Sequence, residues 1–143
     1  MSRYIFVNLK RFDISPSHAG VNRLAPIHMW APTIVSSLEQ GLAQVTALPK
    51  DMVFPVFFPE AHLLGASQAK NVGAPFQVEI GCQSVHTQDT MAGGNFGAFT
   101  TSLPANAAVE LGCSWTLIGH SEQRAKLAGM YQLAGCDGRP AIH

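Results

Sequence analysis

The chain has 143 residues, of which 47% are hydrophobic and only 13% are charged. This makeup is that of one globular domain with enough apolar side chains for a core, and it excludes a disordered chain. Nine basic and nine acidic residues cancel, so no excess of positive charge is present to attract nucleic acid or an anionic membrane surface. We therefore expect no nucleic-acid partner and no membrane partner, and a small molecule as the ligand.

The cysteines and the apolar runs bear on the cellular compartment. Cys82, Cys113 and Cys136 lack the spacing of a zinc or redox motif, so we expect reduced thiols and no metal. No apolar run approaches the roughly 18 residues that cross a membrane, and Lys10 and Arg11 interrupt the apolar N-terminal run. A cytoplasmic location is the resulting expectation.

The first part of the chain predicts a strand, a long loop and a helix. Residues 4–7 are a short apolar run typical of a buried parallel strand, and polar residues Asn8 and Lys10 follow it. Residues 12–32 are rich in Pro, Gly, His and Asn and predict a long loop, which in a compact domain is often functional. Apolar residues then recur at helical spacing, so we expect a helix that begins at Pro32.

The middle of the chain predicts two more strands. Residues 52–58 are apolar, although Pro55 lacks the N–H that a strand interior donates. Residues 60–64 read as a short helix, and residues 76–80 form the third apolar run. A glycine-rich segment, residues 91–100, follows.

The last part predicts two helices separated by a strand. Residues 103–111 suit a helix with Ser102 as its N-cap and Gly112 as its stop. Residues 115–118 are the fourth apolar run, and residues 121–134 suit a final helix. Four successive strand-then-helix units predict an α/β fold with a parallel sheet.

Polar residues gather just after the predicted strands, at Asn8, Lys10, Gln83 and His120. Parallel α/β folds place their active sites at the carboxyl ends of the strands, because the loops converge there. We therefore expect these side chains to share one cleft.

The stretch around His120 predicts a helix start that carries side chains able to take part in a reaction. Ser121 suits an N-cap and Glu122 complements the positive end of the helix dipole. That same positive end disfavours a charge on His120, so we expect a neutral imidazole that donates a hydrogen bond to a carbonyl. With Lys10 and Asn8 it would suit stabilisation of an enediolate. The alternative is a boundary histidine and a surface lysine without a chemical role.

Three motifs resemble the triosephosphate isomerase family. They are Asn-Leu-Lys at residues 8–10, Gly-Ala-Phe-Thr at residues 97–100 and Ile-Gly-His-Ser-Glu-Gln-Arg at residues 118–124. They occur in the family's order, and the resemblance covers most of residues 4–128. It implies interconversion of dihydroxyacetone phosphate and glyceraldehyde 3-phosphate, without a cofactor, on a small phosphorylated sugar as substrate.

The resemblance also implies a role for each matched residue. Asn8 would be an oxyanion donor, and Lys10 would be the cation for substrate and transition state. His120 would be the electrophile, which is the family's neutral histidine. Glu122 would be a partner to Lys10, and Ser121 would combine a helix cap with a hydrogen bond in the site.

A dimer is implied by the second motif. Thr100, next to Phe99, resembles the tip residue that reaches into the neighbouring subunit's active site in the family dimer. We therefore expect a homodimer or another form of self-association.

The chain also departs from the family pattern. Leu9 replaces the usual aromatic residue, and residues 11–29 make a much longer first loop. Ser102 and Gln123 stand where the family has a glutamate and an arginine that pair with each other. Because both partners of the pair are absent, neither charge is left buried without its partner. These departures together indicate a divergent branch of the family.

The length of the chain sets a further expectation. A complete eight-unit barrel takes about 250 residues, so residues 1–143 are expected to be a single partial domain. It would be the N-terminal half of a (β/α)8 barrel, with about four βα units, that ends before strand five. The family's glutamate base and phosphate loops come later, so we expect this chain alone to be nearly inactive. The alternatives are a non-catalytic, self-associating half-barrel, a sugar-phosphate-binding module, and an isomerase of a related sugar phosphate.

Overall fold

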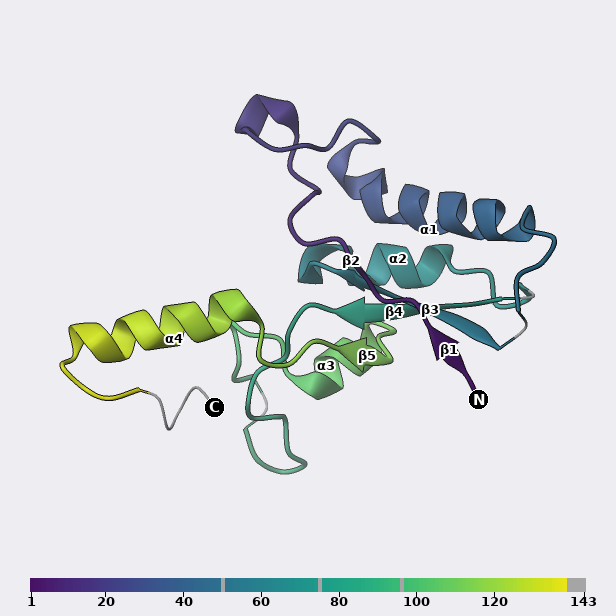
Figure 1. The fold of residues 1–143 in the computed structure, drawn as a ribbon. Helices are drawn as coiled ribbons and strands as arrows, with labels where there is room; N and C mark the ends of the chain where they lie inside the picture. The colour runs from purple at the N-terminus through teal and green to yellow at the C-terminus, as the bar shows by residue number, and fades with distance from the viewer. Residues whose placement is uncertain (50, 75, 96, 139–143) are drawn as a thin grey trace.

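The computed structural model describes residues 1–49, 51–74, 76–95 and 97–138. Figure 1 shows short and long strands side by side, with α1 and α2 lying along one face of the sheet. In chain order the elements are β1 (Arg3–Tyr4), β2 (Val7–Asn8), η1 (Pro16–His18), α1 (Ile27–Ala43), β3 (Met52–Phe58), η2 (Glu60–His62), α2 (Leu63–Ala69), β4 (Gln77–Cys82), α3 (Ala105–Glu110), β5 (Trp115–Thr116) and α4 (Ser121–Leu133). This alternation of parallel strands and helices confirms the predicted partial (β/α) barrel.

Within the described residues, the sheet has four strand positions. β1 and β2 both pair with β3, and β4 and β5 follow in that order, with every pairing parallel. The register places Pro55 opposite Phe6, between the two paired segments. Proline has no N–H to donate, which explains why the first strand is split into β1 and β2. Pro55 is therefore compatible with the strand predicted at residues 52–58, and its cost falls on the neighbouring strand.

Helices α1, α2 and α3 share one core on one face of the sheet. Alternate residues of β3 and β4 point toward these helices, as the period of two in a strand requires. Helix residues that complete the core include Trp30, Val35, Leu63 and Ala108. The strand residues in this core are Phe54, Val56 and Phe58 of β3 and Val78, Ile80 and Cys82 of β4.

The opposite face of the sheet is filled by aromatic rings. The ring centroids of Tyr4 and Trp115 lie 5.5 Å apart, and those of Phe6 and Trp115 lie 5.6 Å apart. These residues come from the first and last strand positions, which three spacings of about 4.8 Å would separate in a flat sheet. The sheet therefore curves toward this face. Gly81 permits the curvature, since a Cβ there would lie 2.6 Å from the ring of Phe57.

Two helix starts differ from the predictions. α1 begins at Ile27 and carries Pro32 inside it, so the prediction of a start at Pro32 was wrong by five residues. The first turn forms because Trp30 is buried against Phe58, at 6.1 Å between ring centroids, and this packing outweighs one lost helix hydrogen bond. Proline is favoured in the first turn of a helix, where its missing N–H would have no partner. In α1, Pro32 lies after the first turn, so its missing N–H costs one hydrogen bond of the helix.

α3 also begins differently. Its N-cap is Pro104, without a side-chain cap, so the prediction of Ser102 as the N-cap was wrong. The carboxylate of Asp89 instead accepts hydrogen bonds from the backbone N–H of Asn106, at 3.1 and 3.2 Å. A residue of a distant loop therefore accepts the hydrogen bond from a backbone N–H in the first turn of α3. The predicted stop at Gly112 is confirmed, since α3 ends at Glu110 and Gly112 has a φ of 89°.

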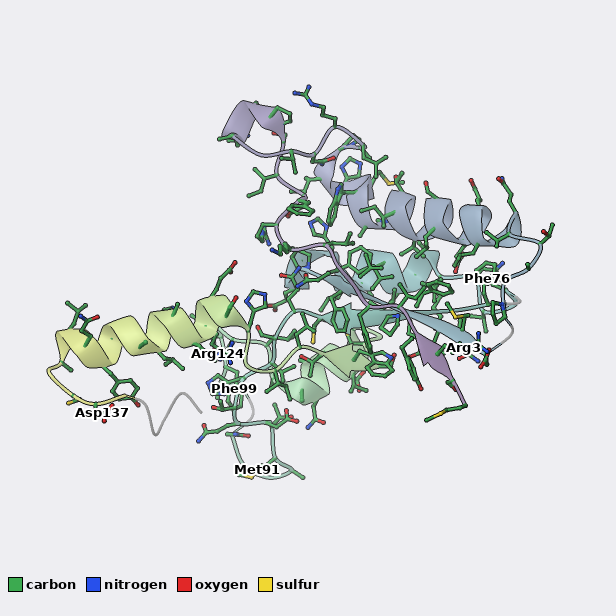
Figure 2. The ribbon with its side chains drawn as sticks, in the orientation of Figure 1. Arg3, Phe76, Met91, Phe99, Arg124 and Asp137 are labelled. Atoms are coloured by element: carbon green, nitrogen blue, oxygen red, sulfur yellow. The ribbon has the colours of Figure 1, made fainter. Side chains whose placement is uncertain are left out.

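The last helix has a different setting. Figure 1 shows α4 extending away from the sheet, and none of its residues is buried. Figure 2 shows its side chains, with Arg124 at the end near the sheet, projecting around the helix. Among the described residues, no helix is long and apolar enough to span a membrane.

Candidate active site

A cavity of about 700 Å³ lies at the carboxyl ends of the strands. It forms where the loops after β3 and β4 meet the first turns of α4, which is the edge that the sequence predicted for an active site. The charged residues and histidines that line it are Arg11, Glu60, His86, His120, Glu122 and Lys126. Gln83 and the buried Cys82, at the end of β4, also line it.

His120 stands at the start of α4 and lines the cavity. It is the N-cap of the helix, and its Nδ1 accepts a hydrogen bond from the backbone N–H of Glu122 at 3.4 Å. A ring nitrogen that accepts carries no proton, so this contact favours the tautomer with its proton on Nε2. Gly119, with a φ of 69°, makes the turn that leads from the strand to this position.

Of the two residues after His120, Glu122 lies where it was predicted and Ser121 does not have its predicted role. Ser121 is the first residue of α4, so the prediction that Ser121 is the N-cap was wrong, because the imidazole holds that place. Glu122 lies in the first turn, as expected for a carboxylate near the positive helix end. Among the salt bridges of the described residues none joins Lys10 to Glu122. Ser121 is not among the residues that line the cavity.

Asn8 is the last residue of β2, and a tight turn at Lys10 follows it. Lys10 has a φ of 47°, a left-handed conformation that costs a residue other than glycine of order 1 kcal/mol or more. The turn is held because the side-chain oxygen of Asn8 accepts from the backbone N–H of Lys10 at 2.9 Å, and Gln83 Nε2 donates to the Lys10 carbonyl at 2.8 Å. Neither Asn8 nor Lys10 lines the cavity in this structure.

The predicted dimer loop lies beside the same region. Phe99 has a φ of 62° and packs its ring on His86, at 5.1 Å between centroids. Thr100 is exposed, whereas its neighbours Thr101 and Ser102 line the cavity. Figure 2 shows Met91 at the tip of the preceding loop, away from the sheet.

Several lining residues escaped the sequence reasoning. Arg11, His86 and Lys126 face the cavity, but none belongs to a matched motif. A signal for Arg11 existed, since it directly follows Lys10 at the end of a predicted strand. Lys126 lies on α4 one helical turn after Glu122 and Gln123, which also line the cavity, and a helical projection from Glu122 would have found it.

Two buried thiols lie next to this cavity. A hydrogen bond with Cys113 lowers the pKa of Cys82 to about 6, whereas the same bond, together with burial, raises the pKa of Cys113. The pair therefore loses its first proton more readily than an ordinary thiol. Among the described residues, no group of three His, Cys, Asp or Glu side chains is placed to hold a metal ion.

Comparison with known proteins gives one consistent relationship. A model of the triosephosphate isomerase family matches residues 32–133. The triosephosphate isomerase of Azoarcus sp. (strain BH72) is 33% identical over 107 residues, which is 74% of this chain and 40% of that protein. That of Synechococcus sp. (strain RCC307) is 36% identical over 83 residues, covering 58% and 29%. That of Candida albicans is 40% identical over 77 residues, covering 54% and 27%.

The chain thus spans less than half the length of these curated relatives. The matched range contains residues 97–100 and His120, whereas it begins after Asn8 and Lys10. Because this match extends over most of the chain and coincides with the helices and strands that surround the cavity, the chain belongs to the triosephosphate isomerase family.

Proposed function

We propose that this chain carries the electrophilic part of a triosephosphate isomerase active site, which interconverts dihydroxyacetone phosphate and glyceraldehyde 3-phosphate. The observation that supports this most is the contact between His120 Nδ1 and the Glu122 amide, two residues that line the cavity. A ring whose Nδ1 accepts carries its proton on Nε2, and that N–H would be the donor to the substrate.

A neutral imidazole suits the reaction's charge changes. When a base removes a proton from the carbon beside the carbonyl, negative charge develops on the carbonyl oxygen and an enediolate forms. His120 Nε2–H would donate to that oxygen and then move a proton between the two enediolate oxygens. Lys10 would supply a nearby cation and Asn8 an amide donor. Their turn is already fixed by the hydrogen bonds of Asn8 and Gln83.

The general base is proposed to come from outside residues 1–143. Glu60 and Glu122 line the cavity, but each carboxylate stands in the first turn of its helix, Glu60 in η2 and Glu122 in α4, where the positive helix end favours a structural role. General-base catalysis contributes roughly 10²–10⁴-fold, so we expect this chain alone to bind the substrate and turn it over slowly at best.

Self-association is part of the proposal. The loop with Phe99 and Thr100 would reach into a second copy, as the family resemblance implies, and a homodimer would result. A cytoplasmic location and a role in glycolysis and gluconeogenesis follow from the same resemblance. No cofactor is required.

A coupled isomerase assay tests the function. Purified chain would be assayed alone and mixed with the carboxyl-terminal part of the Azoarcus relative. We expect near-background turnover alone and restored turnover in the mixture. His120→Gln should lower the restored rate by about 10²-fold or more, because an amide can donate a hydrogen bond but cannot move a proton between the two oxygens. His28→Gln, a change at an exposed histidine away from the cavity, is the matched control.

Other outcomes separate the alternatives. Turnover by the chain alone that Glu122→Gln abolishes would mean that Glu122 is the base, and our account of the base would be wrong. Binding of the sugar phosphate without turnover, in a mixture that forms a stable complex, would favour a non-catalytic binding module.

A further inference from the structure

We propose that Arg11 is a second cationic substrate-binding residue, which binds the phosphate group of the sugar phosphate from a position fixed by buried Asp13. This inference rests on the proposed function, because it concerns the same cavity. It adds a residue that lies outside the matched motifs and belongs to the long first loop.

A buried carboxylate holds Arg11 in place. Arg11 Nη2 lies 2.9 Å from Asp13 Oδ2, and the side chain of Asp13 is only 1% exposed. Asp13 Oδ1 is also buried, without a hydrogen-bond partner among the described residues. Moving Arg11 away would leave a buried negative charge with less compensation, and such a loss is strongly unfavourable. The arginine is therefore held at Asp13.

Asp13 is itself fixed by the core. His62 Nε2 lies 3.0 Å from Asp13 Oδ2, and His62 is 6% exposed. The ring of Trp30 packs on His62 at 5.1 Å between centroids. From the other side of the loop, Asn22 Nδ2 donates to the backbone carbonyl of Asp13 at 3.1 Å. The anchor of Arg11 is thus tied to α1, to η2 and to the loop itself.

The rest of the guanidinium is available to a ligand. The Arg11 side chain is 60% exposed and lines the cavity that contains His120. A guanidinium carries five N–H donors in a planar fork, and the contact with Asp13 is made through one nitrogen. The remaining donors suit the paired oxygens of a phosphate.

Directed contact matters because the formal charges of the Arg, Lys and Glu residues that line the cavity cancel. Its charged lining residues are two cations, Arg11 and Lys126, and two carboxylates, Glu60 and Glu122. Lys126 lies on exposed α4, and the salt bridges recorded for the described part of the chain do not include it. Arg11 is the cation whose position is set before the ligand arrives, so less ordering entropy opposes its contact.

Isothermal titration of the 143-residue chain with glycerol 3-phosphate tests the inference, with glycerol as the uncharged probe. Arg11→Met should weaken binding of glycerol 3-phosphate by about tenfold or more, which corresponds to one hydrogen bond between charged groups. Lys126→Met, which removes the unanchored cation of the same cavity, should weaken it by less than about threefold. Arg11→Lys should recover only part of the loss, because an ammonium lacks the fork.

The outcomes distinguish this inference from the proposed function. Unchanged affinity in Arg11→Met, with binding weakened in His120→Gln, would overturn the role of Arg11 and leave the function standing. Full recovery in Arg11→Lys, or an equal loss in Lys126→Met, would reduce Arg11 to a diffuse charge and overturn the anchored geometry. Absence of binding to the wild-type chain at millimolar glycerol 3-phosphate would overturn both. Because Arg11→Met also leaves the buried Asp13 carboxylate with less compensation, far-UV circular dichroism checks the fold of the variant, and Arg11→Met combined with Asp13→Asn takes its place if the single variant unfolds.

Discussion

The helix-covered face of the sheet and the region from Gly119 through α4 are held in place by different means. On the first, Trp30, Phe58 and Ile80 belong to one core to which α1, α2 and α3 all contribute. In the second, none of the residues of α4 is buried, and the cap at His120 is the contact that orients the helix start. The histidine motif therefore lies on a weakly packed part of the chain.

This difference separates what specifies the fold from what specifies the function. Apolar periodicity places β3, β4 and the three packed helices, because burial of alternate residues is the largest favourable term in folding. The residues around His120 contribute little burial, so their identity reflects chemistry and local capping. Changes in the two regions should consequently have different signatures, and the predictions below contrast them.

The largest contrast is expected from truncating one apolar side chain in each region. Phe58 is fully buried in the core, so Phe58→Ala should lower the free energy of unfolding by roughly 3–5 kcal/mol through lost burial and a cavity. Leu133→Ala, at an exposed position of α4, should change it by about 0.5 kcal/mol or less. Urea unfolding followed by circular dichroism measures both. Similar losses would show that α4 is packed in solution.

The cysteine pair in the core gives a pH dependence. The pKa of Cys82 is lowered to about 6 from the ordinary 9.0, and that of Cys113 is raised. Between about pH 6 and pH 9.0, Cys82 of the folded chain has released a proton that it keeps in the unfolded chain. The free energy of unfolding should therefore rise with pH in this range. The slope should be roughly 1.4 kcal/mol per pH unit at most. Above the ordinary value the unfolded chain loses both protons and the trend should reverse.

Urea titrations from pH 6 to 10 would show this maximum. Cys113→Ala should remove the rise, because it removes the hydrogen bond that lowers the pKa of Cys82. Cys136→Ala, at the exposed cysteine, is the control and should leave the profile unchanged. A rise that survives in Cys113→Ala would have another origin.

Two glycines with positive φ provide a matched pair. Gly112 has a φ of 89° beside the core and Gly119 a φ of 69° before His120. Alanine in either place adopts a left-handed conformation at a cost of about 1–2 kcal/mol. A Cβ on Gly112 would also overlap the Ser67 side chain, whereas nothing lies within 4 Å of one on Gly119.

Gly112→Ala should therefore destabilise the chain more than Gly119→Ala in thermal or urea unfolding. The double variant Gly112→Ala with Ser67→Gly should recover the part of the loss that is due to overlap. Equal effects of the two single variants would show that α3 and α2 yield at this contact without cost.

The sequence predicted the strands and the order of the elements, and it placed His120 at a helix start. It could not predict that α1 begins before Pro32, because the burial of Trp30 that supports the first turn comes from a strand far along the chain. It could not predict that Asp89 caps α3, since that contact joins two loops. The anchor of Arg11 by Asp13 and His62 was hidden for the same reason. Local patterns show which residues are apolar or able to cap, whereas tertiary contacts decide which of these possibilities is realised.

The smallest expected effect on stability separates the two roles of His120. His120→Ala removes the acceptor for the Glu122 amide and should weaken the first turn of α4 by about 1 kcal/mol, whereas His120→Asn keeps an acceptor and should lie within a few tenths of the wild type. Hydrogen exchange of the α4 amides measures this difference. Both variants should nevertheless lose the turnover restored by the relative's carboxyl-terminal part, because asparagine does not replace an imidazole that moves a proton. Full turnover in His120→Asn would mean that the histidine serves the helix alone, and the weakly packed region would then have no chemical role of its own.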